Sequence, residues 1–288
     1  MSTFKKNISV IIPTYNEEAT VSGCLRSLLF QSLLPREILI VDDGSTDNTV
    51  TVVNNLASEK SFGKTKMSLL RQKHLGPGQA RNLGALNSHG SILVFVDADM
   101  TFDEDFIKEL TSPIIRNIAI ATNSKEEKLA NPDNFWAKCW NMGRFASAGI
   151  FTKSYNTTMI PDRSNFGTIY RAIRKDVFSR AGGFETTGDY QDDESLFKKI
   201  GIRASIVKAV FYHANPASAK EVWSRAYWIG SSPSFIGKHN TVKFAVKFSP
   251  PFSLAKGVII ALRFGYLPFI LFKIVYDSAI FMSILNRL

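Results

Sequence analysis

The sequence predicts an α/β fold with a mostly parallel central sheet and helices on both of its faces. Three observations carry this prediction: apolar, β-branched runs recur along the first hundred residues, helix-patterned stretches separate them, and the links between them are short. Strands that alternate with helices in this way pair in parallel, because each helix returns the chain to the same edge of the sheet. The hydrophobic content of 45% is sufficient for a sizeable core and argues against disorder.

The expected elements follow one another in a regular order. Strands are predicted at ISVIIP (8–13), EILIVDDGS (37–45), MSLLRQK (67–73) and SILVFVDAD (91–99). Helices are predicted between them, at residues 19–30, at residues 46–59 with Thr46 or Asp47 as the cap, and at residues 76–90 after a glycine. Additional strands are expected at 118–122, 166–174 and 204–213, and an irregular stretch at 123–165.

The net charge of +10 is concentrated at the C-terminal end. From Lys198 onward 13 Lys and Arg stand against only Glu221 and Asp277, whereas residues 1–197 hold 22 basic and 23 acidic residues. Such an asymmetry indicates that the basic part faces an anionic partner, either nucleic acid or a lipid surface. The two cysteines exclude a disulfide framework, and the first residues lack the apolar core of a secretory signal, so a cytoplasmic catalytic part is expected.

The C-terminal region differs in kind from the rest of the chain. Residues 251–288 are mostly apolar, but Arg263, Lys273 and Asp277 interrupt the span of about 18–20 residues that a membrane-crossing helix needs. A helix or helix pair at the membrane surface fits better, with the preceding lysines near anionic headgroups. We therefore expect a catalytic domain at 1–215 and a membrane-associated helical extension at 216–288, on the cytoplasmic face of the cell membrane.

Polar side chains gather where the predicted strands end. Open α/β sheets bind their ligands at the carboxyl ends of the strands, so these positions are the informative ones. The predicted strand at 91–99 ends in an aspartate pair, Asp97 and Asp99. Carboxylates of this kind hold Mg²⁺ or Mn²⁺ together with substrate phosphates. For the Asp-x-Asp tripeptide alone, a solvated turn is the alternative. The residues at the strand ends are Pro13, Thr14, Tyr15, Asp43, Asp97 and Asp99.

Three segments match a known family in sequence, order and spacing. They are ISVIIPTYNEEATVSGCLRSLLFQS, EILIVDDGSTDNT and GPGQARNLGALNSHGSILVFVDADM. Together they resemble the family 2 glycosyltransferases of the GT-A fold, and a looser likeness extends the resemblance over roughly residues 7–215. The resemblance implies a nucleotide-diphospho-sugar donor bound by residues 1–100, an acceptor held by residues 101–215, and Mn²⁺ or Mg²⁺ as the cofactor.

The resemblance also implies roles for single residues. Pro13, Thr14 and Tyr15 would line the base pocket, Asp43 would take the base edge, Asp97 would lie by the ribose, and Asp99 would bind the metal. Glu17 and Arg81 fall where such enzymes contact the nucleotide or the donor sugar. His213 is a second candidate metal ligand, with a structural or surface role as the alternative. Family habit at Asp43 favours a UDP-sugar, with a GDP-sugar as the alternative.

The segment GDYQDDESLFKKIG supplies a candidate general base. The acceptor hydroxyl must lose a proton, and a carboxylate within hydrogen-bond reach can accept it. In the family the base is usually the second acid of a Glu-Asp pair, so Asp193 fills that place; Asp192 stands where glutamate is common and stays an alternative. Direct displacement by one base inverts the anomeric centre. The segment 223–230 departs from the Gln-x-x-Arg-Trp motif of processive synthases, which favours transfer of a single sugar.

Two other classes of protein are less consistent with the sequence. A nicotinamide-dependent dehydrogenase would carry Gly-x-Gly-x-x-Gly after its first strand, where this chain has PTYNEE. A non-enzymatic nucleic-acid binder could use the aromatic and basic residues of 223–228, but the basic stretch continues directly into an apolar tail. That combination favours a lipid surface over nucleic acid, with a lipid-linked or glycan acceptor.

Overall fold

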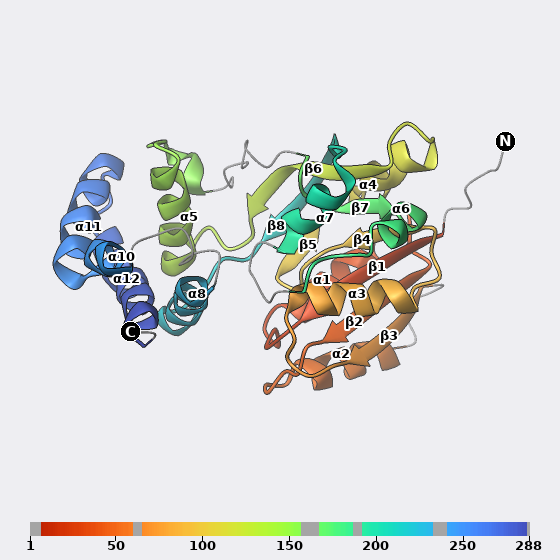
Figure 1. Ribbon diagram of the computed structural model, residues 1–288, viewed down its shortest axis with the longest axis horizontal. Helices are drawn as coiled ribbons and strands as arrows, with labels where there is room; N and C mark the ends of the chain where they lie inside the picture. The colour runs from red at the N-terminus through yellow and green to blue at the C-terminus, as the bar shows by residue number, and fades with distance from the viewer. Residues whose placement is uncertain (1–6, 60–64, 157–166, 187–191, 233–240, 287–288) are drawn as a thin grey trace. The chain divides into compact units, whose positions relative to one another are not determined.

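The computed structural model describes residues 7–59, 65–156, 167–186, 192–232 and 241–286 (Figure 1). The chain forms two compact units. Unit 1 comprises Met1–Glu127 and Pro161–His213, and unit 2 comprises Lys128–Ile160 and Ala214–Leu288. The chain therefore enters unit 2 twice, once between two strands of the sheet and once after the last strand.

The described strands of unit 1 form one mixed sheet in the order β3-β2-β1-β4-β7-β6-β8-β5. Its parallel part is β3-β2-β1-β4, and the pairings β4·β7, β7·β6 and β8·β5 are antiparallel. The predicted α/β class is confirmed, and the three parallel pairings join β3, β2, β1 and β4. The strands are β1 (Ile8–Thr14), β2 (Glu37–Asp42), β3 (Lys66–Arg71), β4 (Ile92–Phe95), β5 (Met100–Phe102), β6 (Ala121–Leu129), β7 (Ala172–Arg174) and β8 (Ser205–His213).

Helices cover both faces of this sheet, as predicted. Successive side chains of a strand point to opposite faces, so Val10 and Ile12 pack in one apolar core while Ile11 packs in the other. The first core contains side chains of α1 (Val21–Leu29), α2 (Thr49–Ser58) and α4 (Phe106–Ile115). The second contains side chains of α3 (Pro77–Asn87), α6 (Lys175–Arg180) and α7 (Asp192–Ile200), and α3 and α7 lie in front of the sheet in Figure 1.

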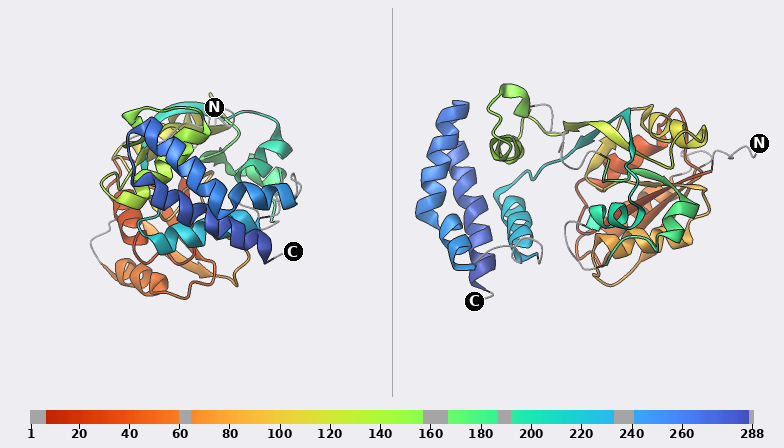
Figure 2. Two further views of the ribbon diagram at one scale, coloured as in Figure 1. Left: turned by 90° about the vertical axis from the view of Figure 1, so that its left-hand side faces the viewer. Right: turned by 45° about the horizontal axis from the view of Figure 1, so that its top comes forward.

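Unit 2 is helical. Buried side chains of α5, among them Met142 and Phe145, pack with Phe269 and Phe272 of the last helix in a separate apolar core. The two longest helices of this unit pack against each other and run side by side in Figure 2. The helices are α5 (Phe135–Ser147), the 3-10 turn η1 (Lys153–Asn156), α8 (Ala219–Ser231), α10 (Thr241–Phe248), α11 (Pro250–Phe264) and α12 (Phe269–Leu285).

The prediction of an irregular stretch at 123–165 is wrong over much of its length. Residues 123–129 continue β6, and residues 135–147 form α5. Asn134 caps this helix by accepting a hydrogen bond from the Ala137 backbone N–H, a signal that was present in the sequence. Because α5 packs with the C-terminal helices, residues 128–160 belong with the tail in unit 2, whereas the sequence placed them in a domain of residues 1–215.

The predicted helical character of the C-terminal extension is confirmed. Among the residues that the structure describes, none of the helices combines the length and the apolar character needed to cross a membrane.

Candidate active site

The predicted site residues of the first hundred positions converge on one edge of unit 1. In the parallel sheet Thr14 lies opposite Asp42, and Ile11 lies opposite Phe95, so β1, β2 and β4 all end at this edge. Pro13 and Thr14 are the last residues of β1, Asp43 follows β2, and Asp97 and Asp99 follow β4. Thr14, Asp43 and Asp99 are buried at this edge. Tyr15, which follows Thr14, is 42% exposed.

Asp97 is held by two arginines. Arg81 Nη2 of α3 donates to Asp97 Oδ1 at 2.8 Å, and Arg171 Nη1, just before β7, lies 3.4 Å from Asp97 Oδ2. Burial alone would raise the pKa of Asp97, but the two guanidinium groups outweigh it and hold the pKa below its ordinary value of 3.8. Asp97 is therefore a carboxylate at neutral pH, fixed in orientation at the edge of the sheet.

Asp99 lies at one end of a chain of three side chains. His213 Nε2, at the end of β8, lies 3.1 Å from Asp99 Oδ2, and His213 Nδ1 lies 3.0 Å from Glu127 Oε1 of β6. Burial by itself would lower the pKa of His213, but the two carboxylates raise it to about 10. The imidazole is consequently protonated at neutral pH and donates to both acids.

The chemistry of Asp99 and His213 is compatible with a divalent cation. Carboxylate oxygen is a ligand of both Mg²⁺ and Mn²⁺, and the imidazole favours the transition metal of the two. The imidazole lies between two carboxylates, so this corner of the site favours positive charge, and a metal ion that bound His213 Nε2 would displace the proton there. Within the described ranges, no group of three or more His, Cys, Asp or Glu side chains could hold a metal by itself. A metal here therefore needs further ligands, as when substrate phosphates complete its coordination.

Asp43 organises the loop that precedes α3. Its Oδ1 accepts from Gln72 Nε2 at 2.6 Å and from the Leu75 N–H at 2.9 Å. Its Oδ2 accepts from the Gly76 N–H at 2.9 Å and lies 2.8 Å from His74 Nδ1. These four contacts use the roughly four acceptor positions of a carboxylate. Contact between Asp43 and a nucleotide base therefore requires one of them to be exchanged.

Tyr15 stacks on the imidazole of His74. The two ring centroids are 4.0 Å apart with 24° between the planes, which is a stacked arrangement. Since Asp43 holds the His74 ring and Tyr15 is partly exposed, the pair forms a flat aromatic surface at the edge of the sheet. A planar base can stack on such a surface.

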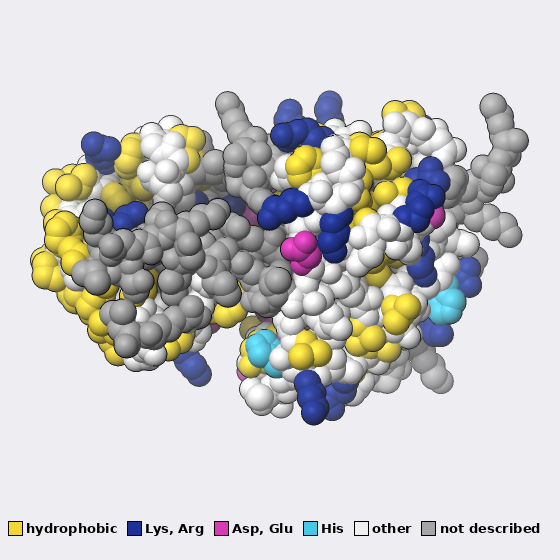
Figure 3. Space-filling model, in the orientation of Figure 1, with side chains coloured by type: hydrophobic (Ala, Val, Ile, Leu, Met, Phe, Trp, Pro, Cys, Tyr) yellow, Lys and Arg dark blue, Asp and Glu magenta, His cyan; other side chains and the backbone are white. Residues whose placement is uncertain are grey.

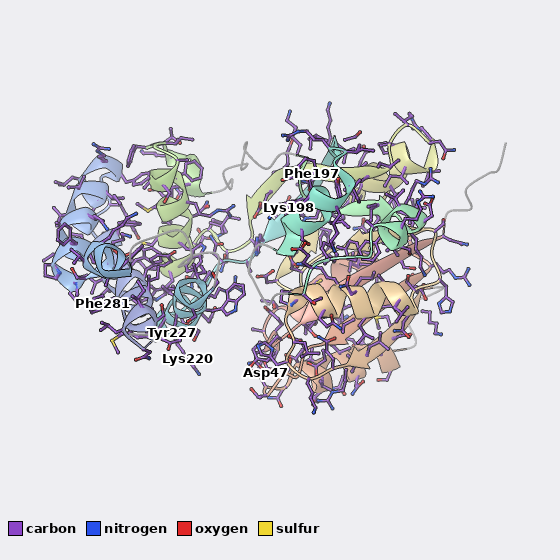
Figure 4. All side chains as sticks on the ribbon, in the orientation of Figure 1. Asp47, Phe197, Lys198, Lys220, Tyr227 and Phe281 are labelled. Carbon is purple, nitrogen blue, oxygen red and sulfur yellow. The ribbon has the colours of Figure 1, made fainter. Side chains whose placement is uncertain are left out.

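Glu17 belongs to a pair of interlocked loops after β1 and β2. Its backbone N–H donates to Thr49 Oγ1 at 2.8 Å, and its carboxylate accepts from Thr20 Oγ1 at 2.5 Å. Asp47, labelled in Figure 4, accepts from the Glu18 N–H at 3.2 Å and from Thr49 Oγ1 at 2.5 Å. The structure thus shows Glu17 as an anchor between the two loops.

The predicted base residues open α7. Asp192 and Asp193 are its first two residues, and their side chains lie outside the described part of the structure. Before the helix, Asn82 of α3 exchanges two hydrogen bonds, at 2.9 and 3.0 Å, with the backbone of Phe184. The Glu185 N–H donates to Ser195 Oγ at 3.0 Å, which ties Glu185 to the first turn of α7.

Three residues of this edge were not predicted from the sequence. They are Arg171, which pairs with Asp97; Glu127, which pairs with His213; and His74, which stacks on Tyr15. Each comes from a segment distant in sequence from its partner, so no local sequence motif predicts the contact. The only signal was position: Arg171 lies within a predicted strand, at 166–174, and His74 follows another, at 67–73.

Comparison with known proteins identifies the family. Residues 9–180, more than half of the chain, match the family described as glycosyl transferase family 2. The chain belongs to glycosyltransferase family 2. The matched region contains the parallel part of the sheet except Ile8, together with the Asp97–x–Asp99 segment and Arg171.

Solved structures share the GT-A fold with this glycosyltransferase. Staphylococcus aureus TarS in complex with UDP-GlcNAc aligns with a TM-score of 0.57 and 19% identity, over 98% of this chain and 92% of TarS as solved. A mannosyltransferase from Pyrobaculum calidifontis, solved with GDP-Man and Mn²⁺, aligns with a TM-score of 0.57 and 20% identity, over 99% of this chain and 87% of that one.

Curated relatives match part of this chain. An uncharacterised glycosyltransferase of Haemophilus influenzae is 30% identical over 116 residues, which are 40% of this chain and 45% of that protein. The poly(ribitol-phosphate) β-N-acetylglucosaminyltransferase TarS of Staphylococcus aureus is 35% identical over 104 residues, 35% of this chain and 18% of TarS. The matches thus cover less than half the length of these two relatives.

Proposed function

We propose that the protein is an inverting glycosyltransferase that moves a single sugar from a nucleotide-diphospho-sugar to a hydroxyl group of a lipid-linked or glycan acceptor. The observation that carries this proposal is the edge of unit 1, where Asp97 is fixed by two arginines and Asp99 is buried against His213. Family membership supports the reaction class. The nucleotide-sugars bound by the structural neighbours support the donor class.

The donor would lie along this edge. Its base would stack on Tyr15, beside Pro13 and Thr14, with Asp43 at the base edge and Asp97 at the ribose. Arg81 would act by orienting Asp97 and by contributing positive charge near the donor, and Glu17 by holding the loop that contacts the nucleotide. A UDP-sugar is favoured and a GDP-sugar is the alternative, since one neighbour was solved with each kind of donor.

Asp99 and His213 would hold the divalent ion, Mn²⁺ or Mg²⁺, and His213 would give up its Nε2 proton as the ion binds. The ion, when bound, stabilises the negative charge that develops on the leaving diphosphate. Asp193, or Asp192 in its place, would accept the proton of the attacking acceptor hydroxyl. Both acids begin α7, whose backbone N–H groups stabilise carboxylates at its N-terminus. With a single base and no separate nucleophile, displacement occurs on the face opposite the leaving group, and the anomeric centre inverts.

The proposed place of reaction is the cytoplasmic face of the cell membrane. In the proposed division of labour, residues 1–100 bind the donor, residues 101–215 hold the acceptor and the base, and residues 216–288 associate with the anionic membrane surface. The excess of basic over acidic residues after position 213 and the apolar composition of the tail support this assignment.

A thermal-shift experiment tests the donor and the metal together. A ligand that binds only the native state raises the melting temperature. UDP-GlcNAc and GDP-Man, each with and without Mn²⁺ or Mg²⁺, should be tried first; one of them is expected to stabilise the wild type in a metal-dependent way. Asp99→Ala should lose the metal-dependent part of the shift. Glu109→Ala, which removes an exposed carboxylate of α4, is the matched control and should keep it.

The donor proposal would be contradicted if a broad panel of UDP-, GDP- and other nucleotide-sugars, with either metal, left the wild-type melting temperature unchanged. An Asp99→Ala variant that retains the full metal-dependent shift would remove Asp99 from the metal site.

A further inference from the structure

Helix α11 turns its small side chains inward. Ser253, Gly257 and Ala261 recur every four residues, lie on one side of the helix and are buried. A Cβ atom at Gly257 would lie 3.3 Å from Lys273 Cβ and 3.4 Å from Ile270 Cα, so α11 packs closely against α12 at this position. Close helix packing through small residues is typical of helices whose other side faces an apolar medium.

The opposite side of α11 is apolar and exposed. Ile259 is 55% exposed and Leu262 is 66% exposed, and no charged side chain lies between them in the helical projection. Hydrophobic side chains colour the edge of the molecule over α11 in Figure 3. A helix that faces water has the reverse arrangement, and a contiguous exposed apolar face marks an interaction surface. The exposed residues of this face are Pro251, Phe252, Leu254, Ala255, Val258, Ile259 and Leu262.

The C-terminal region that contains this face carries a net positive charge. Residues 214–288 contain nine Lys and Arg but only two acids, Glu221 and Asp277. Asp277 is buried and accepts from Lys273 Nζ at 2.6 Å and Ser253 Oγ at 2.9 Å. Glu221 accepts from the Ala217 N–H and from Ser218 Oγ, both at 2.9 Å, at the start of α8. In contrast, Arg263 borders the apolar face and is exposed.

We propose that the outward face of α11 inserts into the outer part of an anionic lipid leaflet, with the helix axis in the plane of the membrane. The apolar side chains enter the acyl region, and Arg263 with the neighbouring lysines contacts the headgroups. Fifteen residues give a helix of about 22 Å, suited to lying in the interface. This inference builds on the proposed membrane association of the tail and is independent of the donor and of the transfer reaction.

Vesicle co-sedimentation of the full chain tests the proposal. The vesicles are phosphatidylcholine alone and phosphatidylcholine with phosphatidylserine. The test variant is Ile259→Glu/Leu262→Glu, and the matched control is Leu86→Glu/Ile118→Glu, which makes the same exchanges at exposed positions of unit 1. Wild type and control should bind the phosphatidylserine vesicles, and the test variant should bind at least tenfold more weakly. Binding of the wild type to phosphatidylcholine alone should be weaker.

A probe of depth provides a second readout. An environment-sensitive fluorophore attached at Ile259→Cys should shift to shorter wavelength with phosphatidylserine vesicles, and the same fluorophore at Leu86→Cys should not. The native Cys24 and Cys139 are buried, so labelling should be confined to the introduced thiol. The metal-dependent thermal shift with donor should be equal in wild type and test variant, which separates failure of this inference from failure of the proposed reaction.

Three results would overturn the proposal. The first is wild-type protein that stays in the supernatant with every vesicle composition. The second is a test variant that sediments as fully as the wild type. The third is a wild-type protein that is dimeric in solution and binds no vesicles, together with a test variant that is monomeric. The face would then be covered by a second copy of this chain.

Discussion

Helices α1 and α11 have opposite burial patterns. In α1 the large apolar side chains Leu25 and Leu28 are fully buried against the sheet, and Arg26 faces out and pairs with Glu59. In α11 the buried positions carry small residues, and Leu262 and Ile259 face out. Mean apolar content therefore does not reveal what surrounds a helix. The surroundings follow from which face of the helix carries the large apolar side chains. Of these two helices, α1 has the arrangement of a helix that faces water, and α11 does not.

The two units also use their carboxylates differently. At the strand ends of unit 1, Asp97 and Asp99 lie beside arginines or a histidine at the edge of the sheet. In unit 2, Asp277 is completely buried and bonded to Lys273 and Ser253, where it links α11 to α12. The first arrangement leaves charge available to a ligand, and the second consumes it in packing. The proposed donor site and the proposed membrane contact therefore lie in different units.

The largest expected effect comes from removing the proposed base, which should impair the reaction assigned to unit 1 and leave the membrane binding proposed for unit 2 unchanged. Asp193→Asn should lower transfer by about 10²–10⁴-fold, because a positioned general base contributes about that much. Donor binding by thermal shift and vesicle binding should both stay at wild-type level. The measurement is transfer of radiolabelled sugar to acceptor. Wild-type turnover in this variant would exclude Asp193 and direct attention to Asp192, whose Asp192→Asn variant is the companion.

The next effect compares α1 with α11 directly. Leu25→Ala should lower the free energy of unfolding by about 2–5 kcal/mol, since it opens a cavity in a packed core. Leu262→Ala makes the same exchange on the outward face of α11 and should change that free energy by no more than about 0.5 kcal/mol in the absence of lipid. Urea denaturation of the full chain measures both. Equal losses would mean that Leu262 is covered in solution and would remove the contrast.

The smallest effect concerns a buried carboxylate of unit 1 far from the site. Burial alone would raise the pKa of Glu37, but hydrogen bonds from Ser9 and His89 outweigh it and hold the pKa below 4.5. A depressed pKa stabilises the fold above the unfolded value and loses that contribution as the pH falls through the folded value. Glu37→Gln should cost about 1–3 kcal/mol at pH 7, and the difference from wild type should shrink below pH about 4.5. Urea denaturation across pH 3–7 measures it; a constant difference would contradict the assignment.

Much of unit 1 was predictable because its first half is built from local patterns. Apolar runs, helical spacing and turn residues place β1 to β4 and α1 to α3 within a few residues of their observed bounds. Parallel pairing then brings the ends of these strands to one edge, so Asp43, Asp97 and Asp99 could be assigned to a common site from sequence alone. α5 was missed because its aromatic side chains pack with a tail more than a hundred residues away.

The sequence by itself determined the fold class, the strand-end residues, the family and the excess of positive charge in the tail. Tertiary structure alone decided which groups meet: Arg171 with Asp97, His213 with Asp99 and Glu127, and His74 with Tyr15. It also decided that the small residues of α11 face inward. The physical reason is range. Local propensity and periodicity act over a few residues, whereas Asp99 and His213 are separated by 114 positions and meet only because the antiparallel pairing of β5 and β8 brings them together.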